Sequence, residues 1–132
     1  MGNEKLYGDN WIEIEYDKEY RWIYTNWRNI QTLTSIMNGG NMMLKFLKEK
    51  GCSKVLNDNR LVQGAWTFAS DYTENEWFPA MVGAGLRHFA WISPNDVFSQ
   101  FSIDRLKTIQ STGIIRLFDD IEEAKEWLKN CN

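Results

Sequence analysis

Apolar and polar residues alternate along two short stretches near the start of the chain. The range 11–16 reads WIEIEY, and the range 20–25 reads YRWIYT. Alternation with a period of two is typical of a half-exposed β-strand, and both stretches are rich in the aromatic and β-branched residues that favour strands. The polar residues 17–19 lie between the two stretches and suit a turn. The pattern therefore predicts a β-hairpin over 11–25.

The period changes to that of a helix over the range 29–50. Its apolar residues recur three or four positions apart, at Ile30, Leu33, Ile36, Met37, Met43, Leu44 and Leu47. Gly39 and Gly40 interrupt this stretch, and each should cost about 1 kcal/mol relative to alanine. Two explanations are open: the helix breaks at the glycines, or the glycines let it lie close against the sheet. Gly51 predicts the end of the helix.

The rest of the chain alternates between strand-like and helix-like stretches. Strands are predicted at 55–56, 86–92 and 114–118, and helices at 65–85, 95–109 and 121–128. The capping-box spacing from Thr73 to Glu76 predicts that a second helix begins inside 65–85. After the hairpin, this alternation implies parallel neighbouring strands with right-handed crossovers. We therefore predict one α/β domain over 1–132, with a mixed five-stranded sheet, an N-terminal β-hairpin and about four helices.

Composition and charge narrow the classes of function. The formal net charge of -3 and the pI near 5.2 argue against nucleic-acid binding, which requires a basic surface. No apolar run approaches the roughly 18 residues of a membrane-spanning helix, and residues 1–5 lack the apolar core of a signal peptide. Two cysteines, Cys52 and Cys131, are too few for a disulfide framework. We therefore expect a cytoplasmic protein with reduced thiols and no stable membrane insertion.

A polar run follows the predicted strand 55–56 and contains Asn57, Asp58, Asn59 and Arg60. These residue types favour a turn, and in open α/β sheets ligands or partners bind at the carboxyl ends of strands. Asp58 and Arg60 could anchor an anionic or hydrogen-bonding ligand, with the two asparagines as neutral partners. The alternative is a purely structural turn whose side chains satisfy their own backbone and cap the next helix.

Aromatic residues make up 14% of the chain, which is high, and three tryptophans follow the polar run. Trp66, Trp77 and Trp91 either fill the layer between helix and sheet or line a pocket near the predicted turn. Both readings agree with the tendency of large rings to be buried. The second one predicts an apolar, aromatic-lined site for a small ligand.

No constellation of catalytic or metal-ligating residues stands out. His88 is the single histidine, and we expect it to be a partly exposed or hydrogen-bonded residue of a strand. Glu74 and Glu76 lie two positions apart, so they would not face each other on a helix as an acid/base pair. We therefore expect no metal, no cofactor and no enzymatic activity.

A family resemblance is carried by short segments at 55–60, 64–66, 77–80, 85–86 with 89–91, and 123–124 with 127–128. These segments resemble the STAS (SpoIIAA-like) domains of anti-sigma-factor antagonists and a group of bacterial proteins similar to them. The resemblance covers nearly the whole chain and implies a SpoIIAA-like fold, an architecture shared with the lipid-carrying CRAL-TRIO domains. It also implies a regulatory or ligand-binding domain rather than an enzyme.

In the anti-sigma-factor antagonists, a Ser or Thr near the end of the third strand is phosphorylated by a partner kinase. This chain departs from that pattern, because residues 57–64 contain no hydroxyl. Thr67 and Ser70 are the nearest candidates and lie on the predicted helix. The departure argues against a phosphorylation switch of this kind.

Taken together, the sequence favours a non-enzymatic, STAS-like protein-interaction domain. It would dock another protein, or a second copy of itself as a homodimer, through the turn at 57–60 and the helix that begins near Trp66. The alternative is a small-molecule or lipid-binding domain with an apolar pocket lined by Trp66, Trp77 and Trp91.

Overall fold

The structure is a computed structural model, and it describes residues 2–132. Its strands are β1 (Asn3–Gly8), β2 (Ile12–Asp17), β3 (Trp22–Ile30), β4 (Lys54–Gln63), β5 (His88–Ile92) and β6 (Ile115–Phe118). Its helical segments are α1 (Leu33–Lys50), η1 (Thr67–Ala69), α2 (Ser70–Tyr72), η2 (Thr73–Trp77), α3 (Phe78–Gly83), α4 (Val97–Asp104), α5 (Lys107–Gln110) and α6 (Ile121–Asn130). The α/β class and the mixed sheet are as the sequence predicts.

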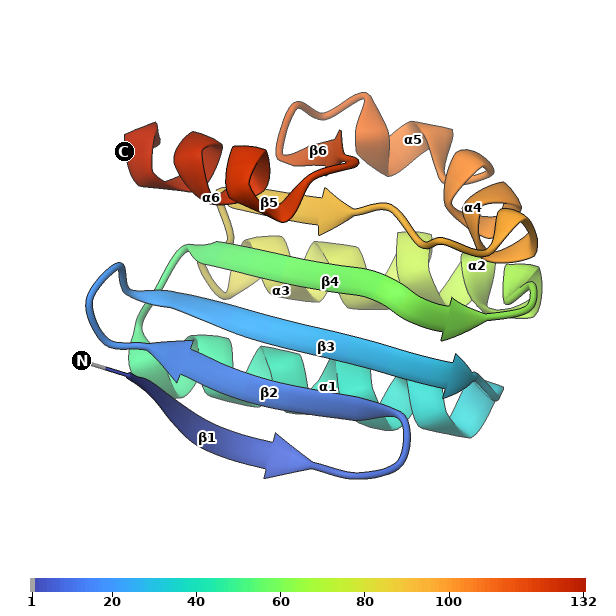
Figure 1. Ribbon diagram of the computed structural model, residues 1–132, viewed down its shortest axis with the longest axis horizontal. Helices are drawn as coiled ribbons and strands as arrows, with labels where there is room; N and C mark the ends of the chain where they lie inside the picture. Colours follow the sequence, from blue (N-terminus) through green and yellow to red (C-terminus); the bar gives the residue numbers. More distant parts are fainter. Residues whose placement is uncertain (1) are drawn as a thin grey trace.

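The six strands within residues 2–132 form one sheet, and they neighbour one another in the order of the chain (Figure 1). The pairs β1–β2 and β2–β3 are antiparallel, whereas β3–β4, β4–β5 and β5–β6 are parallel. The prediction of five strands is therefore wrong by one. The missed strand is β1, an edge strand with no fully buried residue, so its sequence lacks the alternation that marked its neighbours.

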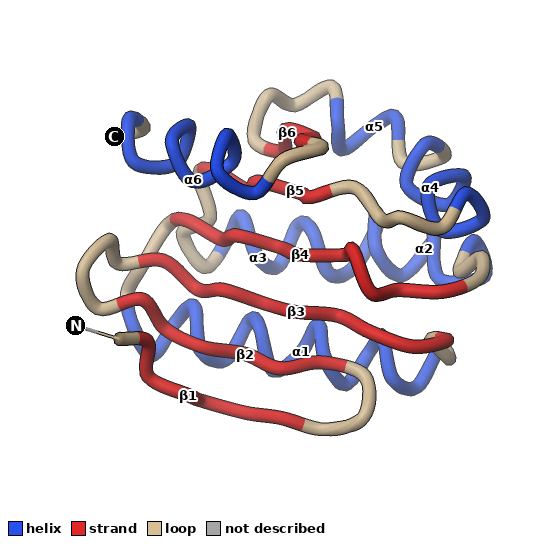
Figure 2. Tube along the Cα trace, in the orientation of Figure 1, coloured by secondary structure: helices blue, strands red, loops and turns tan. Residues whose placement is uncertain are grey.

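Helices cover both faces of the sheet, but unequally (Figures 1 and 2). The helices that connect the parallel strands all lie on one face, as right-handed crossovers between adjacent strands require. That face holds the larger core, in which Ile23, Val55 and Phe89 of the sheet are buried. Helix α6 lies on the opposite face, where Leu128 packs in a smaller core with Leu56 and other buried residues. None of the helices in residues 2–132 is long and apolar enough to cross a membrane.

Helix α1 runs unbroken through Gly39 and Gly40, which decides between the two explanations that the sequence left open. A Cβ atom on Gly39 would overlap the indole ring of Trp27, and one on Gly40 would lie 2.8 Å from the Tyr72 hydroxyl and 2.9 Å from Cδ1 of Trp77. The glycines therefore let the helix approach the aromatic side chains beneath it. Gly51, with φ +60°, ends the helix as predicted.

The turn predicted over residues 57–60 is wrong, because these residues lie inside the ten-residue strand β4. Asn57, Asp58 and Asn59 are all buried. Asparagine and aspartate favour turns because their side chains bond the local backbone. Here Asn57 and Asp58 are bonded by side chains of the neighbouring strand β3. Tertiary partners therefore override the local preference.

The predicted helix start at Thr73 is also wrong, because residues 67–83 are helical throughout. The Thr73 hydroxyl donates to the Ala69 carbonyl one turn earlier, instead of capping a new helix. Residues Thr73–Trp77 form a π-helical turn in which the Phe78 N–H bonds the Thr73 carbonyl. The π-helical turn ends directly before α3, and Pro79, which has no N–H, lies in the first turn of α3.

Candidate functional site

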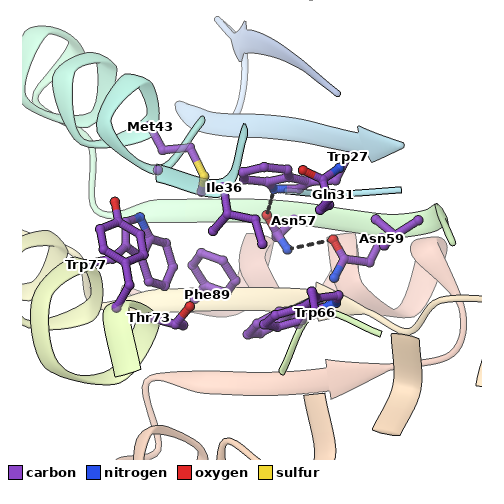
Figure 3. A pocket seen from close by; sticks show the side chains of 14 residues that line it. Trp27, Gln31, Ile36, Met43, Asn57, Asn59, Trp66, Thr73, Trp77 and Phe89 are labelled. Carbon is purple, nitrogen blue, oxygen red and sulfur yellow. Dashed lines mark hydrogen bonds between the residues drawn. The ribbon is translucent and has the colours of Figure 1, made fainter. Parts of the chain in front are cut away.

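A cavity of about 60 Å³ lies between the sheet and the helices α1, α2 and η2 (Figure 3). Most of its lining is aromatic or apolar, and the polar part consists of uncharged side chains. The lining residues are Trp27, Gln31, Ile36, Gly40, Met43, Asn57, Asn59, Val62, Trp66, Tyr72, Thr73, Trp77, Phe89 and Trp91. They come from strands β3, β4 and β5, from the helices above them and from the loops after β3 and β4. The cavity therefore forms only when the sheet and these helices pack together.

The aromatic walls form a connected row. Trp66 stacks on Trp91 with ring centroids 6.1 Å apart and an interplanar angle of 13°. Trp91 meets Phe89 at 5.6 Å and 66°, and Phe89 meets Trp77 edge to face at 5.6 Å and 82°. These offset and edge-on arrangements are the favourable ones for aromatic pairs. The row holds the rings in fixed orientations around the cavity.

The orientation of Asn57 is fixed by two donors from β3. The Thr25 hydroxyl donates to Asn57 Oδ1 at 2.6 Å, and the Trp27 indole N–H donates to the same oxygen at 2.9 Å. Because an indole N–H can only donate, the oxygen of Asn57 must face Trp27. The amide nitrogen of Asn57 then donates to Asn59 Oδ1 at 3.3 Å, as the dashed lines of Figure 3 indicate. This chain of bonds directs donors, not acceptors, toward the cavity.

The segment after β4 is anchored by helix α4, which positions Trp66. The Ser102 hydroxyl accepts the backbone N–H of Trp66 at 2.7 Å, and the Ser99 hydroxyl donates to the Gly64 carbonyl at 2.6 Å. Gly64 adopts a positive φ of 76°, which a glycine adopts without strain. A β-bulge in β4 opposite Trp27 shifts the pairing register just before this segment. Bulges often re-aim side chains beside functional sites.

Two tryptophans of the cavity lining each have an indole N–H group with no hydrogen-bond partner within the described chain. They belong to Trp77 and Trp91, which are 8% and 5% exposed, and both nitrogen atoms are fully shielded. A buried N–H without an acceptor costs about 1–3 kcal/mol. Structural tryptophans usually have their N–H groups satisfied, so two such groups in the lining of one small cavity favour a binding role for it.

Asp58 and Arg60 face the other side of the sheet, away from the cavity. Arg60 grips the carboxylate of Asp58 in a bidentate ion pair, with N–O distances of 2.9 and 2.7 Å, and the Tyr24 hydroxyl donates to the same carboxylate at 2.8 Å. Burial alone would raise the pKa of Asp58, but these hydrogen bonds and the charge of Arg60 hold that pKa below its usual value. Burial and Asp58 together raise the pKa of the Tyr24 hydroxyl strongly. We interpret this cluster as structural, because it links β3 to β4.

The structure thus divides the seven residues that the sequence singled out for binding. Asn57, Asn59, Trp66, Trp77 and Trp91 line the cavity, whereas Asp58 and Arg60 do not. Sequence reasoning missed the remaining lining residues, which include Trp27, Gln31, Ile36, Gly40 and Tyr72. The unusual glycine pair inside a helix was the one signal that pointed to them.

The other residues considered from the sequence lie elsewhere. The ring of His88 packs edge to face on Trp127 at 5.6 Å, and burial, with the nearby charge of Lys54, lowers its pKa. Thr67 and Ser70 lie at the start of the helical stretch, and the Ser70 hydroxyl oxygen is shielded from solvent. In residues 2–132, no group of three His, Cys, Asp or Glu side chains is arranged to hold a metal ion.

Comparisons of this chain with protein-family models, with curated proteins and with solved structures gave no match. The functional argument therefore rests on the geometry of the site.

Proposed function

We propose that this protein is a small-molecule-binding domain whose site is the aromatic cavity between the sheet and helices α1, α2 and η2. The observation that carries the proposal is the pair of buried, unpartnered indole N–H groups of Trp77 and Trp91 in its lining. An apolar cavity with a few fixed polar groups is the usual form of a small-molecule site. In this proposal the stacked rings provide apolar contact and the N–H groups provide orientation.

The size of the cavity limits what enters it. A volume of about 60 Å³ is below the roughly 300 Å³ of a typical small-molecule site, so it suits one functional group rather than a whole drug-sized ligand. On α1, Leu33, Ile36, Met37 and Gly40 lie three or four positions apart and therefore share one face. Ile36 and Gly40 line the cavity, while Leu33 and Met37 are exposed. The apolar lining thus continues to the surface, where the rest of a ligand could lie.

Native mass spectrometry of the protein, purified gently from its source, tests the proposal. We expect a bound small molecule that is released on denaturation. Ile36→Trp should remove it, because a larger ring at this half-buried position would occupy the cavity. Thr34→Trp is the matched control, since it adds the same ring on the same helix at an exposed position outside the lining. Ligand-free wild-type protein, or equal occupancy in both variants, would contradict the proposal.

A second candidate function is docking of another protein or of a second copy of this chain. It is favoured by exposed apolar side chains in the segment that follows Arg60, namely Leu61 at 52% and Phe68 at 54% exposure. Exposed large apolar groups of this kind mark interaction surfaces when they lie together. Sedimentation velocity of the wild type and of a Leu61→Ser/Phe68→Ser variant tests it. If two copies of this chain dock to each other, the wild type should be a dimer and the variant a monomer. A monomeric wild type would exclude the homodimer and leave docking to a different protein.

Membership of the STAS-like group is likewise a proposal. It is supported by the alternation of strands and helices after the N-terminal hairpin, which is the element order that the resemblance implies. The departure at the phosphorylation position remains, because residues 57–64 carry no hydroxyl. We therefore include no phosphorylation switch in the proposed function.

A further inference from the structure

The hydrogen-bonding groups of the cavity are unequally divided between donors and acceptors. The oxygen of Asn57 already accepts from Thr25 and Trp27, and the oxygen of Asn59 accepts from Asn57. The Gln31 side-chain oxygen accepts from the Ser35 hydroxyl, and its nitrogen donates to the carbonyls of Trp11 and Arg28. The side-chain amide oxygens are thus already engaged within the protein.

The hydroxyl groups in the lining have also used their hydrogens. Thr73 donates to the Ala69 carbonyl at 2.9 Å, and Tyr72 donates to the Met37 carbonyl at 3.4 Å. Among the described residues 2–132 that line the cavity, the hydrogens that remain free belong to nitrogen atoms: the indoles of Trp77 and Trp91, the amide of Asn59 and the second amide hydrogen of Asn57. A ligand that satisfies this site must therefore offer an acceptor.

Charge further restricts the ligand. Among the described residues 2–132, no Asp, Glu, Lys, Arg or His lines the cavity. A carboxylate would therefore be buried without a counter-charge, which is expensive in an apolar site. An ammonium group can only donate hydrogen bonds, so it would leave the N–H groups of the cavity without an acceptor, although the aromatic faces would attract it. A neutral acceptor avoids both penalties.

We infer that the cavity binds a neutral carbonyl group carried on an apolar body, such as that of a ketone, ester or amide. This inference rests on the proposed function and specifies its ligand class. The carbonyl oxygen accepts from one of the free N–H groups of Trp77, Trp91 or Asn59, and the apolar body packs on the rings of Trp66 and Trp91. The site selects an acceptor because two hydrogen bonds fix the orientation of its amide groups. Trp27 donates to the oxygen of Asn57, and the nitrogen of Asn57 donates to the oxygen of Asn59.

Indole N–H signals in a proton–nitrogen NMR spectrum of the full chain give a direct test. The seven tryptophans give a small set of indole signals, and Trp77→Phe and Trp91→Phe variants assign the two that matter. The probe is cyclopentanone. Methylenecyclopentane has the same shape without the acceptor oxygen, and cyclopentylammonium and cyclopentanecarboxylate carry the two charges.

We expect cyclopentanone to shift the indole proton of Trp77 or of Trp91 downfield, and to do so at a concentration at least several-fold lower than any of the three analogues requires. Equal shifts with methylenecyclopentane, or stronger binding of a charged analogue, would overturn the carbonyl inference while leaving a small-molecule site in place. If no probe moves either signal, and water exchange shows that both N–H groups bond only to water, the inference and the proposed function both fail.

Discussion

The indole N–H of Trp27 and the side-chain oxygen of Asn57 are joined by a hydrogen bond of 2.9 Å between β3 and β4. This bond fixes which way the amide of Asn57 points, and through it the amide of Asn59. A single contact between residues 30 positions apart thereby sets the hydrogen-bonding character of the cavity.

Replacing Asn57 with leucine should destabilise the fold and disorder the site. The hydroxyl of Thr25 and the N–H of Trp27 would lose their common acceptor in a buried place, at a cost of about 1–3 kcal/mol in the free energy of unfolding. Urea denaturation measures this change. Asn41→Leu, an exposed substitution on α1, is the control and should change stability by less than about 0.5 kcal/mol. Equal effects of both substitutions would show that the network contributes no stability.

Replacing Gly39 with alanine should destabilise the protein despite the better helix propensity of alanine. The added methyl group would overlap the ring of Trp27, and such overpacking costs about 1–3 kcal/mol. Gly83→Ala is the matched control, because this helical glycine has no atom within 4 Å of the added Cβ. The control should be neutral or stabilising by up to about 1 kcal/mol. Thermal or urea unfolding of the two variants decides the point, and a stabilised Gly39→Ala protein would contradict the close approach.

The ion pair of Asp58 and Arg60 predicts a pH-dependent effect of Arg60→Ala. In the wild type the pKa of Asp58 is below its unfolded value of about 3.9, so its stabilising contribution is present above that pH and is lost as pH falls further. Without Arg60, burial would instead raise this pKa. Because the guanidinium is 41% exposed, we expect a loss of about 1–3 kcal/mol at pH 7, below the value for a fully buried pair.

The loss caused by Arg60→Ala should shrink between pH 7 and pH 3, since Asp58 becomes protonated. Urea titrations at several pH values measure the trend. In an Asp58→Asn background the same substitution should have little dependence on pH, because the titrating group is gone. A penalty that stays constant with pH in the wild-type background would argue against the pair.

Lys54 fastens the end of α6 to β4. Its ammonium group donates to the carbonyls of Leu128 and Cys131 at 2.6 and 2.7 Å, where the helix C-terminus carries partial negative charge. Lys54→Met should therefore lower stability by about 1 kcal/mol and increase amide hydrogen exchange in α6. Lys18→Met, in the exposed turn after β2, removes the same charge and should do neither. Unchanged exchange in α6 would contradict this role of Lys54.

The sequence alone determined the elements that depend on neighbours along the chain. The hairpin follows from alternation over 11–25, and the last helix follows from its apolar spacing and from Asp120, whose side chain accepts the Glu123 N–H as a helix cap. Gly51 was predicted as the end of α1 for the same reason. These features need only the local backbone and the residues three or four positions away.

Only the tertiary structure decided that residues 57–60 belong to a strand, that α1 continues through Gly39 and Gly40, and that the cavity forms. Each depends on partners that are distant in the chain. Thr25 and Trp27 of β3 donate hydrogen bonds to Asn57, and Gly39 packs directly against the ring of Trp27. A polar run favours a turn when its groups must be satisfied locally or by water. It becomes a buried strand when neighbouring strands supply its hydrogen bonds, and no local pattern encodes that supply.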